Sequence, residues 1–258
     1  MRGDFQSRLR RSLRRRDSAR ASIDPTEVED FDQRVADEID AELLEETPED
    51  AIFLDLETTG LRADRSLTAL IGILYRENDS MRLEQWYSGD VVAERRQLQR
   101  LQQYLGRFRT IVSYNGNGFD VPFLRTRWRW HRIADPTVSM ESLDLLVPVR
   151  KKYRGRWSDC RLATVERELL GLPRCAQDLP GSEAPLRFQD LREGGPVSLI
   201  EPVLLHNRRD LMSLVALRKV LLGVTITDQE AAASGGQRHD LEAVCSPARN
   251  RSSKQEPS

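Results

Sequence analysis

The chain has 258 residues, of which 39% are hydrophobic and 31% are charged, and its formal net charge is −1. This balance is typical of a globular protein with polar ends and excludes a wholly disordered chain. There is no apolar run near the roughly 20 residues that span a bilayer, no secretory signal, and no C-x-x-C pair among the three cysteines. We therefore expect a soluble cytoplasmic protein without a membrane partner.

The small net charge conceals three blocks of different charge. Residues 1–20 carry eight Arg and two acidic residues, whereas residues 24–50 carry thirteen acidic residues and one Arg. Removing the +6 of the first block and the −12 of the second from the total leaves +5 for residues 51–258. A mildly basic remainder permits a groove for nucleic acid but does not demonstrate one.

This charge pattern also suggests the domain organisation. Residues 1–50 lack the apolar residues for a core of their own, so we expect a flexible extension that is first basic and then acidic. Residues 51–223 form the expected folded domain. Residues 224–258 are rich in Ala, Ser, Gly and Arg, and we expect a disordered tail.

The folded domain opens with three predicted strands. AIFLDLE, starting at residue 51, is a short apolar run typical of a buried strand, and SLTALIGILYRE and MRLEQWYSG alternate well enough to follow as strands of a meander. A helix is predicted at 91–109 and a fourth strand at IVSYN. Pro122 suits the first turn of a helix that runs to about residue 132.

The second half alternates helices with one more strand. SLDLL is the predicted fifth strand, and CRLATVERELLG is an amphipathic helix ended by Gly171. Residues 171–196 are expected to run over the surface, and a last helix is expected from about Pro202 to Gly223. The order of elements predicts an α/β fold with a mixed sheet, in which three antiparallel leading strands are flanked by helices.

Four acidic residues stand at the expected ends of these elements. Asp55 and Glu57 are two apart on a strand, so their side chains share one face; Asp120 stands at a helix entrance, and Asp210 lies on the last helix. Carboxylate oxygens suit Mg²⁺ or Mn²⁺, and two such ions can activate water and neutralise the charge of a phosphodiester transition state. Each acid taken alone is more often a helix cap or a member of an ion pair than a metal ligand.

Three segments around these acids, FLDLETTGL, YNGNGFDVPFL and HNRRDLMSLVAL, together resemble the exonuclease motifs of the DEDD superfamily in order and context. SLDLL, CRLATVERELLGL and DLPGSEAP extend the likeness to the YprB-type ribonuclease H-like branch, over about residues 51 to 222. The resemblance implies a ribonuclease H-like fold and two metal ions, Mg²⁺ or Mn²⁺. It assigns the metal-binding role to Asp55, Glu57, Asp120 and Asp210.

His206 is a departure from the resembled pattern. It stands four residues before Asp210, where the tyrosine-type DEDD enzymes have Tyr, whereas the histidine-type members place their base one residue earlier. Residues four apart lie on one helix face, so His206 can act as a general base near Asp210. The alternative is a helix histidine that is paired with an acid or that caps a carbonyl.

We also predict a set of nucleic-acid contacts. Asn115 either shapes the substrate groove or forms the turn in NGNG, and the basic cluster around residue 150 either binds phosphate or is a solvated surface. His131 and His239 lack motif context and are expected to be solvated. The predicted contact residues are Thr58, Asn115, Phe119, Lys151, Lys152 and Arg154.

The predicted function is metal-dependent 3′–5′ exonuclease-like hydrolysis of nucleic-acid phosphodiesters. The substrate is DNA or RNA that is single-stranded or has a free end. Two alternatives stay open. One is a nucleic-acid-binding ribonuclease H-like module with little cleavage, suggested by the spacing of His206; the other is a structure-selective endonuclease.

Overall fold

The computed structural model describes Leu44, residues 47–174 and residues 179–233, with side chains up to Gly223. The predicted N-terminal extension therefore lies almost wholly outside the described residues, as do His239 and the tail from residue 234. Among the described residues, no helix is long and apolar enough to cross a membrane.

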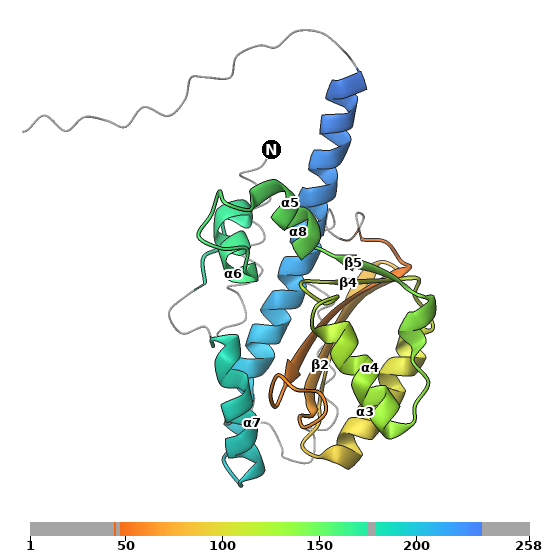
Figure 1. Cartoon of the computed structure of the whole chain (residues 1–258), viewed down its shortest axis with the longest axis vertical. Coiled ribbons are helices and arrows are strands. Elements are labelled where there is room, and N and C mark those ends of the chain that lie inside the picture. The colour runs from red at the N-terminus through yellow and green to blue at the C-terminus, as the bar shows by residue number, and fades with distance from the viewer. Residues whose placement is uncertain (1–43, 45–46, 175–178, 234–258) are drawn as a thin grey trace, which may run out of the picture. The chain divides into compact units, whose positions relative to one another are not determined.

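The centre of the fold is a five-stranded mixed sheet in the order β3-β2-β1-β4-β5 (Figure 1). The first three strands form the predicted antiparallel meander, and β4 and β5 then join beside β1 as parallel strands. This confirms the predicted α/β fold. The strands are β1 (Ala51–Thr58), β2 (Thr68–Glu77), β3 (Ser80–Tyr87), β4 (Thr110–Ser113) and β5 (Glu141–Asp144).

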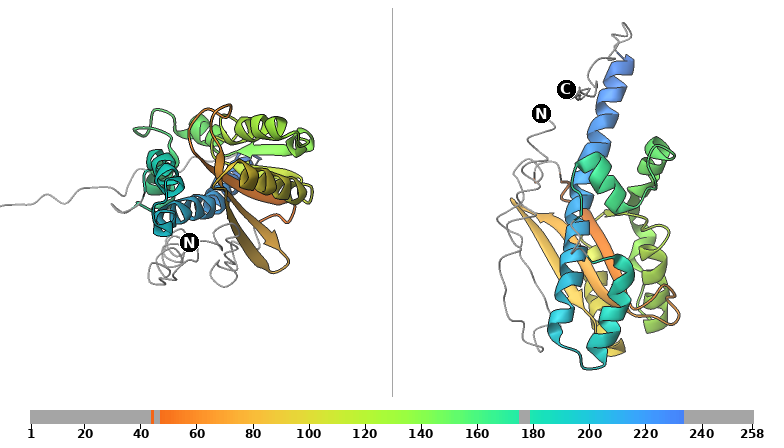
Figure 2. Two further views of the ribbon diagram at one scale, coloured as in Figure 1. Left: turned by 90° about the horizontal axis from the view of Figure 1, so that it is seen from below. Right: turned by 90° about the vertical axis from the view of Figure 1, so that its left-hand side faces the viewer.

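Helices cover both faces of this sheet, with α3 and α4 on one face and α8 on the other (Figures 1 and 2). Short 3-10 turns lie at Pro136–Ser139 (η2), Gly181–Glu183 (η4) and Val197–Leu199 (η5), and the five-residue η3, Glu166–Leu170, is a π-helix that continues α6. The α-helices are α3 (Val91–Leu105), α4 (Asp120–His131), α5 (Leu146–Tyr153), α6 (Leu162–Val165), α7 (Ala184–Arg192) and α8 (Glu201–Ala233).

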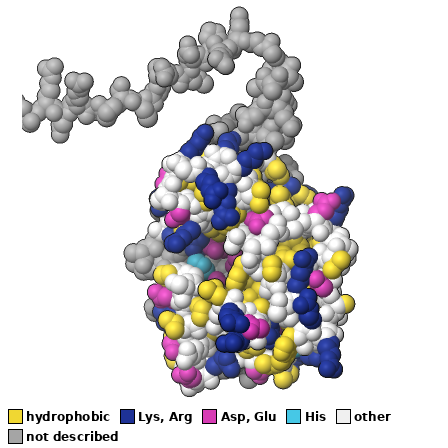
Figure 3. Space-filling view, in the orientation of Figure 1, with side chains coloured by type: hydrophobic (Ala, Val, Ile, Leu, Met, Phe, Trp, Pro, Cys, Tyr) yellow, Lys and Arg dark blue, Asp and Glu magenta, His cyan; other side chains and the backbone are white. Residues whose placement is uncertain are grey.

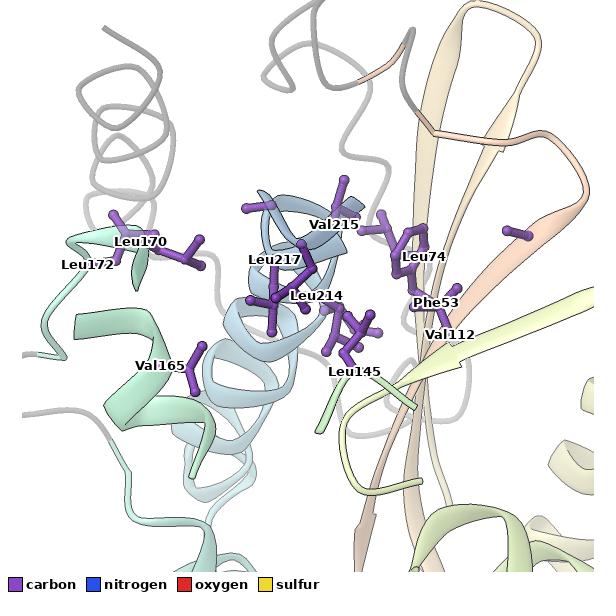
Figure 4. Packing of buried hydrophobic residues seen from close by; sticks show 14 of the residues in the cluster. Phe53, Leu74, Val112, Leu145, Val165, Leu170, Leu172, Leu214, Val215 and Leu217 are labelled. Carbon is purple, nitrogen blue, oxygen red and sulfur yellow. The ribbon is translucent and has the colours of Figure 1, made fainter. Parts of the chain in front are cut away.

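Alternation along β1 decides which side chains face which helix. Ile52 and Leu54 belong to the core cluster that contains α3 and α4, whereas Phe53 belongs to the cluster that contains α8. Figure 4 shows Phe53, Leu74 and Val112 of the sheet opposite Leu214 and Leu217 of α8. Because side chains alternate with a period of two, Asp55 and Glu57 share the face of Phe53. They therefore lie on the side that α8 covers.

Two expectations for the second half of the chain were wrong. The stretch 171–196 is not a plain surface excursion, because it contains α7, and its Phe188 is buried and stacks on Tyr87 with ring centroids 5.9 Å apart. The last helix does not end at Gly223 but continues to Ala233. A single helical glycine costs only about 1 kcal/mol relative to alanine, which does not by itself end a helix.

α8 approaches the sheet most closely at Gly72. In the sheet register Gly72 lies between Asp55 on β1 and Gln85 on β3. Asn207 of α8 is fully buried over this glycine; its amide nitrogen donates to the Asp55 carboxylate at 2.7 Å, and its amide oxygen accepts from Gln85 Nε2 at 2.8 Å. A Cβ at position 72 would stand 2.0 Å from Asn207 Oδ1, so only glycine fits beneath this helix.

Gly72→Ala is expected to lower the free energy of unfolding by about 1–3 kcal/mol or more, because overpacking forces α8 off its position. Urea unfolding followed by circular dichroism measures the change. Gly106→Ala is the matched control, since its added Cβ would stand at an ordinary 3.5 Å from Gln103 O. Equal stability of the two variants would contradict the close approach at Gly72.

Candidate active site

The four predicted acids come from three elements, β1, α4 and α8, that meet near the end of β1. Asp55 and Glu57 lie near the end of β1, Asp120 is the first residue of α4, and Asp210 lies on α8. Asp120 is held beside β1 because its Oδ1 accepts from the backbone N–H of Leu56 at 3.2 Å. The fold thus brings together residues that are up to 155 positions apart in the sequence.

The loop before Asp120 is itself held by Asp144 at the end of β5. The Asp144 carboxylate accepts from the backbone N–H groups of Asn115 at 2.8 Å and Asn117 at 3.1 Å. Asn115 has a φ of 62°, so it forms a left-handed turn residue, for which asparagine is suited. Asp144 is therefore a strand-end residue that shapes the turn into α4.

His206 and Asp210 lie one helical turn apart on α8 and face the acids of β1. His206 Nε2 is 3.8 Å from Glu57 Oε1 and 3.7 Å from Asp210 Oδ2, and the His206 side chain is 8% exposed. These contacts place the imidazole among the acids, as both interpretations of His206 require. Figure 3 shows a histidine and acidic side chains in a hollow, with basic side chains above them in that view.

Arg174 completes the site from the segment that follows Gly171. Its Nη2 donates to Asp210 Oδ1 at 2.5 Å, and its Nη1 lies 3.2 Å from His206 Nδ1. Because a guanidinium only donates, this contact requires His206 Nδ1 to accept. A neutral His206 then carries its proton on Nε2, the nitrogen that faces Glu57 and Asp210.

The four acids act on one another electrostatically. Burial raises the pKa of Asp55 well above its usual value, and the charges of Asp210, Glu57 and Asp120 raise it further. Burial, with Asp210 and Asp120, raises the pKa of Glu57 to about 8. Burial also raises the pKa of Asp120 to about 7 despite backbone hydrogen bonds that lower it. Ionising all the acids of such a cluster is unfavourable in free energy, and a nearby cation reduces this penalty.

Carboxylate oxygens are the donors that Mg²⁺ and Mn²⁺ prefer, and buried acids that repel one another favour a divalent cation. In the part of the chain that the structure describes, however, no group of three His, Cys, Asp or Glu side chains is in place to hold a metal ion. Asp210 is bonded to Arg174 and Asp55 to Asn207. The donor set therefore fits such ions in chemistry, and in this arrangement a guanidinium, that of Arg174, occupies one oxygen of Asp210.

The comparisons with known proteins decide the family. The RNase H superfamily model matches residues 52–222, more than half of the chain. The chain belongs to the RNase H superfamily. Over 172 residues it is 31% identical to the uncharacterized protein YprB of Bacillus subtilis, a match that covers 64% of this chain and 40% of that relative. The chain thus spans about two fifths of the length of YprB. The predicted YprB-type ribonuclease H-like domain is confirmed.

Among solved structures, the likeness to one polymerase bears on the fold. The family B DNA polymerase of Pyrobaculum calidifontis matches with a TM-score of 0.55 at 17% identity, over 68% of this chain and 25% of the polymerase. Brucella melitensis NrnC bound to pGG matches with a lower TM-score of 0.45 at 19% identity, over 74% and 80% of the two chains. At 17% identity the likeness to the polymerase concerns the fold alone.

The other predicted site residues lie close to the acids in the chain or on and just after α5. Thr58 is buried and its hydroxyl donates to Gly60 O at 2.9 Å, while Phe119 packs on Phe123 with ring centroids 5.6 Å apart. Lys151, Lys152 and Arg154 are exposed on and just after α5. Contact of any of these residues with nucleic acid stays a prediction.

The expectation that His131 is solvated was wrong. It is 3% exposed, and its Nε2 lies 2.7 Å from the buried Glu94, which is also bonded to Arg127 and to the backbone N–H of Thr68. Arg127 in turn donates to Ala63 O at 3.1 Å. This buried network ties α3 and α4 to the loop after Glu57. Its members lie 33 and 37 residues apart, so local sequence context did not reveal it.

The raised pKa values predict how the metal-free protein responds to pH. A carboxyl whose folded pKa is raised stabilises the fold at pH values below its unfolded pKa, near 4, and loses that contribution as pH rises through the folded pKa. With folded pKa values of about 8 for Glu57 and about 7 for Asp120, the free energy of unfolding should fall between about pH 4 and 8.

Urea unfolding in EDTA at pH 5.5 and pH 8.5 tests this. We expect a loss of at least about 1.4 kcal/mol at the higher pH, the equivalent of one pKa unit. Glu57→Gln should reduce the loss, because it removes one of the buried acids. Stability that rises with pH, or an unchanged dependence in Glu57→Gln, would contradict the described cluster.

Proposed function

We propose that this chain is a metal-dependent nuclease that hydrolyses nucleic-acid phosphodiesters by a two-metal mechanism, as a 3′–5′ exonuclease of the DEDD kind. The observation that carries the proposal is the meeting of four buried or half-buried carboxylates from β1, α4 and α8, in which burial and neighbouring acids raise the pKa of Asp55, Glu57 and Asp120. Membership of the RNase H superfamily supports it. Without a bound cation, such a concentration of acids only lowers the stability of the fold.

In this proposal Asp55, Glu57, Asp120 and Asp210 hold two divalent cations, Mg²⁺ or Mn²⁺. When bound, the ions supply an activated water and neutralise the charge that develops on the phosphate. Burial of the acids keeps the surrounding dielectric low, which strengthens every electrostatic interaction with the reacting group.

His206 is proposed as the general base. Its imidazole lies between Glu57 and Asp210, and histidine is the side chain that most often serves as a general base. The Nε2 that faces the acids must then be the accepting nitrogen, whereas the Arg174 contact leaves the proton of a neutral ring there. Catalysis by His206 therefore requires Arg174 to leave Nδ1.

The proposed substrate is a DNA or RNA strand with a free end. The exposed cations after β5, Lys151, Lys152 and Arg154, are proposed to contact its phosphates, and Thr58, Asn115 and Phe119 to line its path beside the acids. Charge contacts of this kind are independent of sequence, so the proposal includes no base preference.

Asp55→Asn is expected to lower the release of nucleotides from end-labelled single strands by at least about 100-fold, because it removes a metal ligand rather than an outer partner of one. DNA and RNA strands with Mg²⁺ or Mn²⁺ provide the measurement. Asp79→Asn, the same substitution at an exposed residue in the turn between β2 and β3, is the matched control and should keep full activity.

Substrates without ends separate the alternatives. Cleavage of a circular single strand would replace the exonuclease proposal by an endonuclease. A wild-type protein that binds strands tightly, releases no nucleotide with either metal and binds strands equally in EDTA would instead be a binding module, and the proposed nuclease function would be wrong.

A further inference from the structure

Arg174 is anchored by a buried acid outside the four-carboxylate cluster. Its Nε donates to Glu166 Oε2 at 2.6 Å, and its Nη2 lies 3.1 Å from Glu166 Oε1, so the two groups meet in a fork. The Glu166 side chain is fully buried and also accepts from Ser213 Oγ of α8 at 2.7 Å. This geometry fixes one edge of the guanidinium.

The backbone around this anchor has an uncommon form. Glu166 begins the π-helix η3, and Gly171, with a φ of 66°, ends it in the left-handed conformation. The N–H of Leu172 returns to Glu166 O at 2.8 Å, and Arg209 of α8 donates to Pro173 O at 3.2 Å. π-Helical turns are rare in proteins overall, but those that occur are often at functional sites. Here the turn leads the chain back over Glu166 and delivers Arg174 to α8.

The remaining part of the guanidinium faces the proposed metal site. Arg174 Nη2 bonds to Asp210 Oδ1 and Nη1 to His206 Nδ1, and the arginine side chain is only 16% exposed. Arg174 thus stands between a structural acid that holds it and a site acid that a cation would need. A divalent ion and a guanidinium, both cationic, compete for the charge of the same carboxylate.

We propose that Arg174 is a phosphate-binding residue of this site, which pairs with Asp210 until divalent cations take that carboxylate and then binds the substrate phosphate. This inference rests on the proposed function. Once Asp210 binds a cation, Glu166 still holds the arginine beside the metals. A phosphate oxygen is then the anion that can replace Asp210, and the planar fork of arginine suits phosphate oxygens.

The proposal predicts two opposite effects of Arg174→Gln. Without a competing guanidinium, Mn²⁺ alone should bind at least about fivefold tighter, the lower end of common coupling between sites. With Mn²⁺ saturating, thymidine 5′-monophosphate should bind at least about tenfold weaker, because a charge-assisted contact to its phosphate is lost. This nucleotide carries the phosphate but has no phosphodiester to cleave. Calorimetry and Mn²⁺ electron paramagnetic resonance measure both affinities.

Two further variants complete the experiment. Arg167→Gln removes an equal charge from the π-helix that precedes Arg174, where Arg167 pairs with the exposed Glu168, and should leave both affinities unchanged. Arg174→Lys keeps the charge opposite Glu166 and Asp210 but loses the fork. It should bind Mn²⁺ nearly as the wild type does and should bind the nucleotide more weakly. The proposal can therefore still be tested if Arg174→Gln folds poorly.

Failure of this inference differs from failure of the proposed function. A wild-type protein that binds Mn²⁺ and nucleotide, together with Arg174 variants whose two affinities are unchanged or shift in the same direction, would overturn the role of Arg174 alone. A wild-type protein that binds no Mn²⁺ would overturn both proposals.

Discussion

The position of α8 on the sheet depends on one buried contact, the Asn207 amide over Gly72. It joins the row Asp55, Gly72 and Gln85 across three strands to a helix that the chain reaches more than 100 residues later. The same contact decides the site, because His206 and Asp210 lie on the helix that Asn207 anchors. A shift of α8 at this point would separate Asp210 from Asp55 and Glu57. The packing of Asn207 over Gly72 therefore also sets where Asp210 lies relative to the acids of β1.

Charge balance is the second constraint on the molecule. Glu94 is buried, but its negative charge is balanced by Arg127, and it also contacts His131. Glu94 therefore serves to hold the loop after Glu57. The four site acids are different, because burial and the charges of neighbouring acids raise the pKa of three of them. Asp210 is paired with Arg174. Removing one partner of a buried charge pair is strongly destabilising, so a cation that displaces Arg174 must neutralise Asp210 in its place.

Local sequence signals predicted much of this fold and little of its charge compensation. A short apolar run predicted β1 and alternation predicted β2 and β3. Gly171 was predicted as a helix end, and it has the left-handed backbone that favours glycine. The motifs predicted where the acids stand in the fold, because each motif includes the strand or helix on which its acid lies. Arg174 and Asn207 were missed, since their roles arise from partners 36 and 152 residues away, respectively. α7 was missed because its weakly amphipathic sequence contributes only a few buried side chains, Phe188 among them.

The most direct test of the account is the crystal structure of the full chain soaked with Mn²⁺, with anomalous scattering used to locate the ions. The account predicts two anomalous peaks among Asp55, Glu57, Asp120 and Asp210, with the Arg174 guanidinium no longer on Asp210 and still on Glu166. A well-ordered site without peaks at saturating Mn²⁺, or with Asp210 still bonded to Arg174 beside the ions, would contradict it.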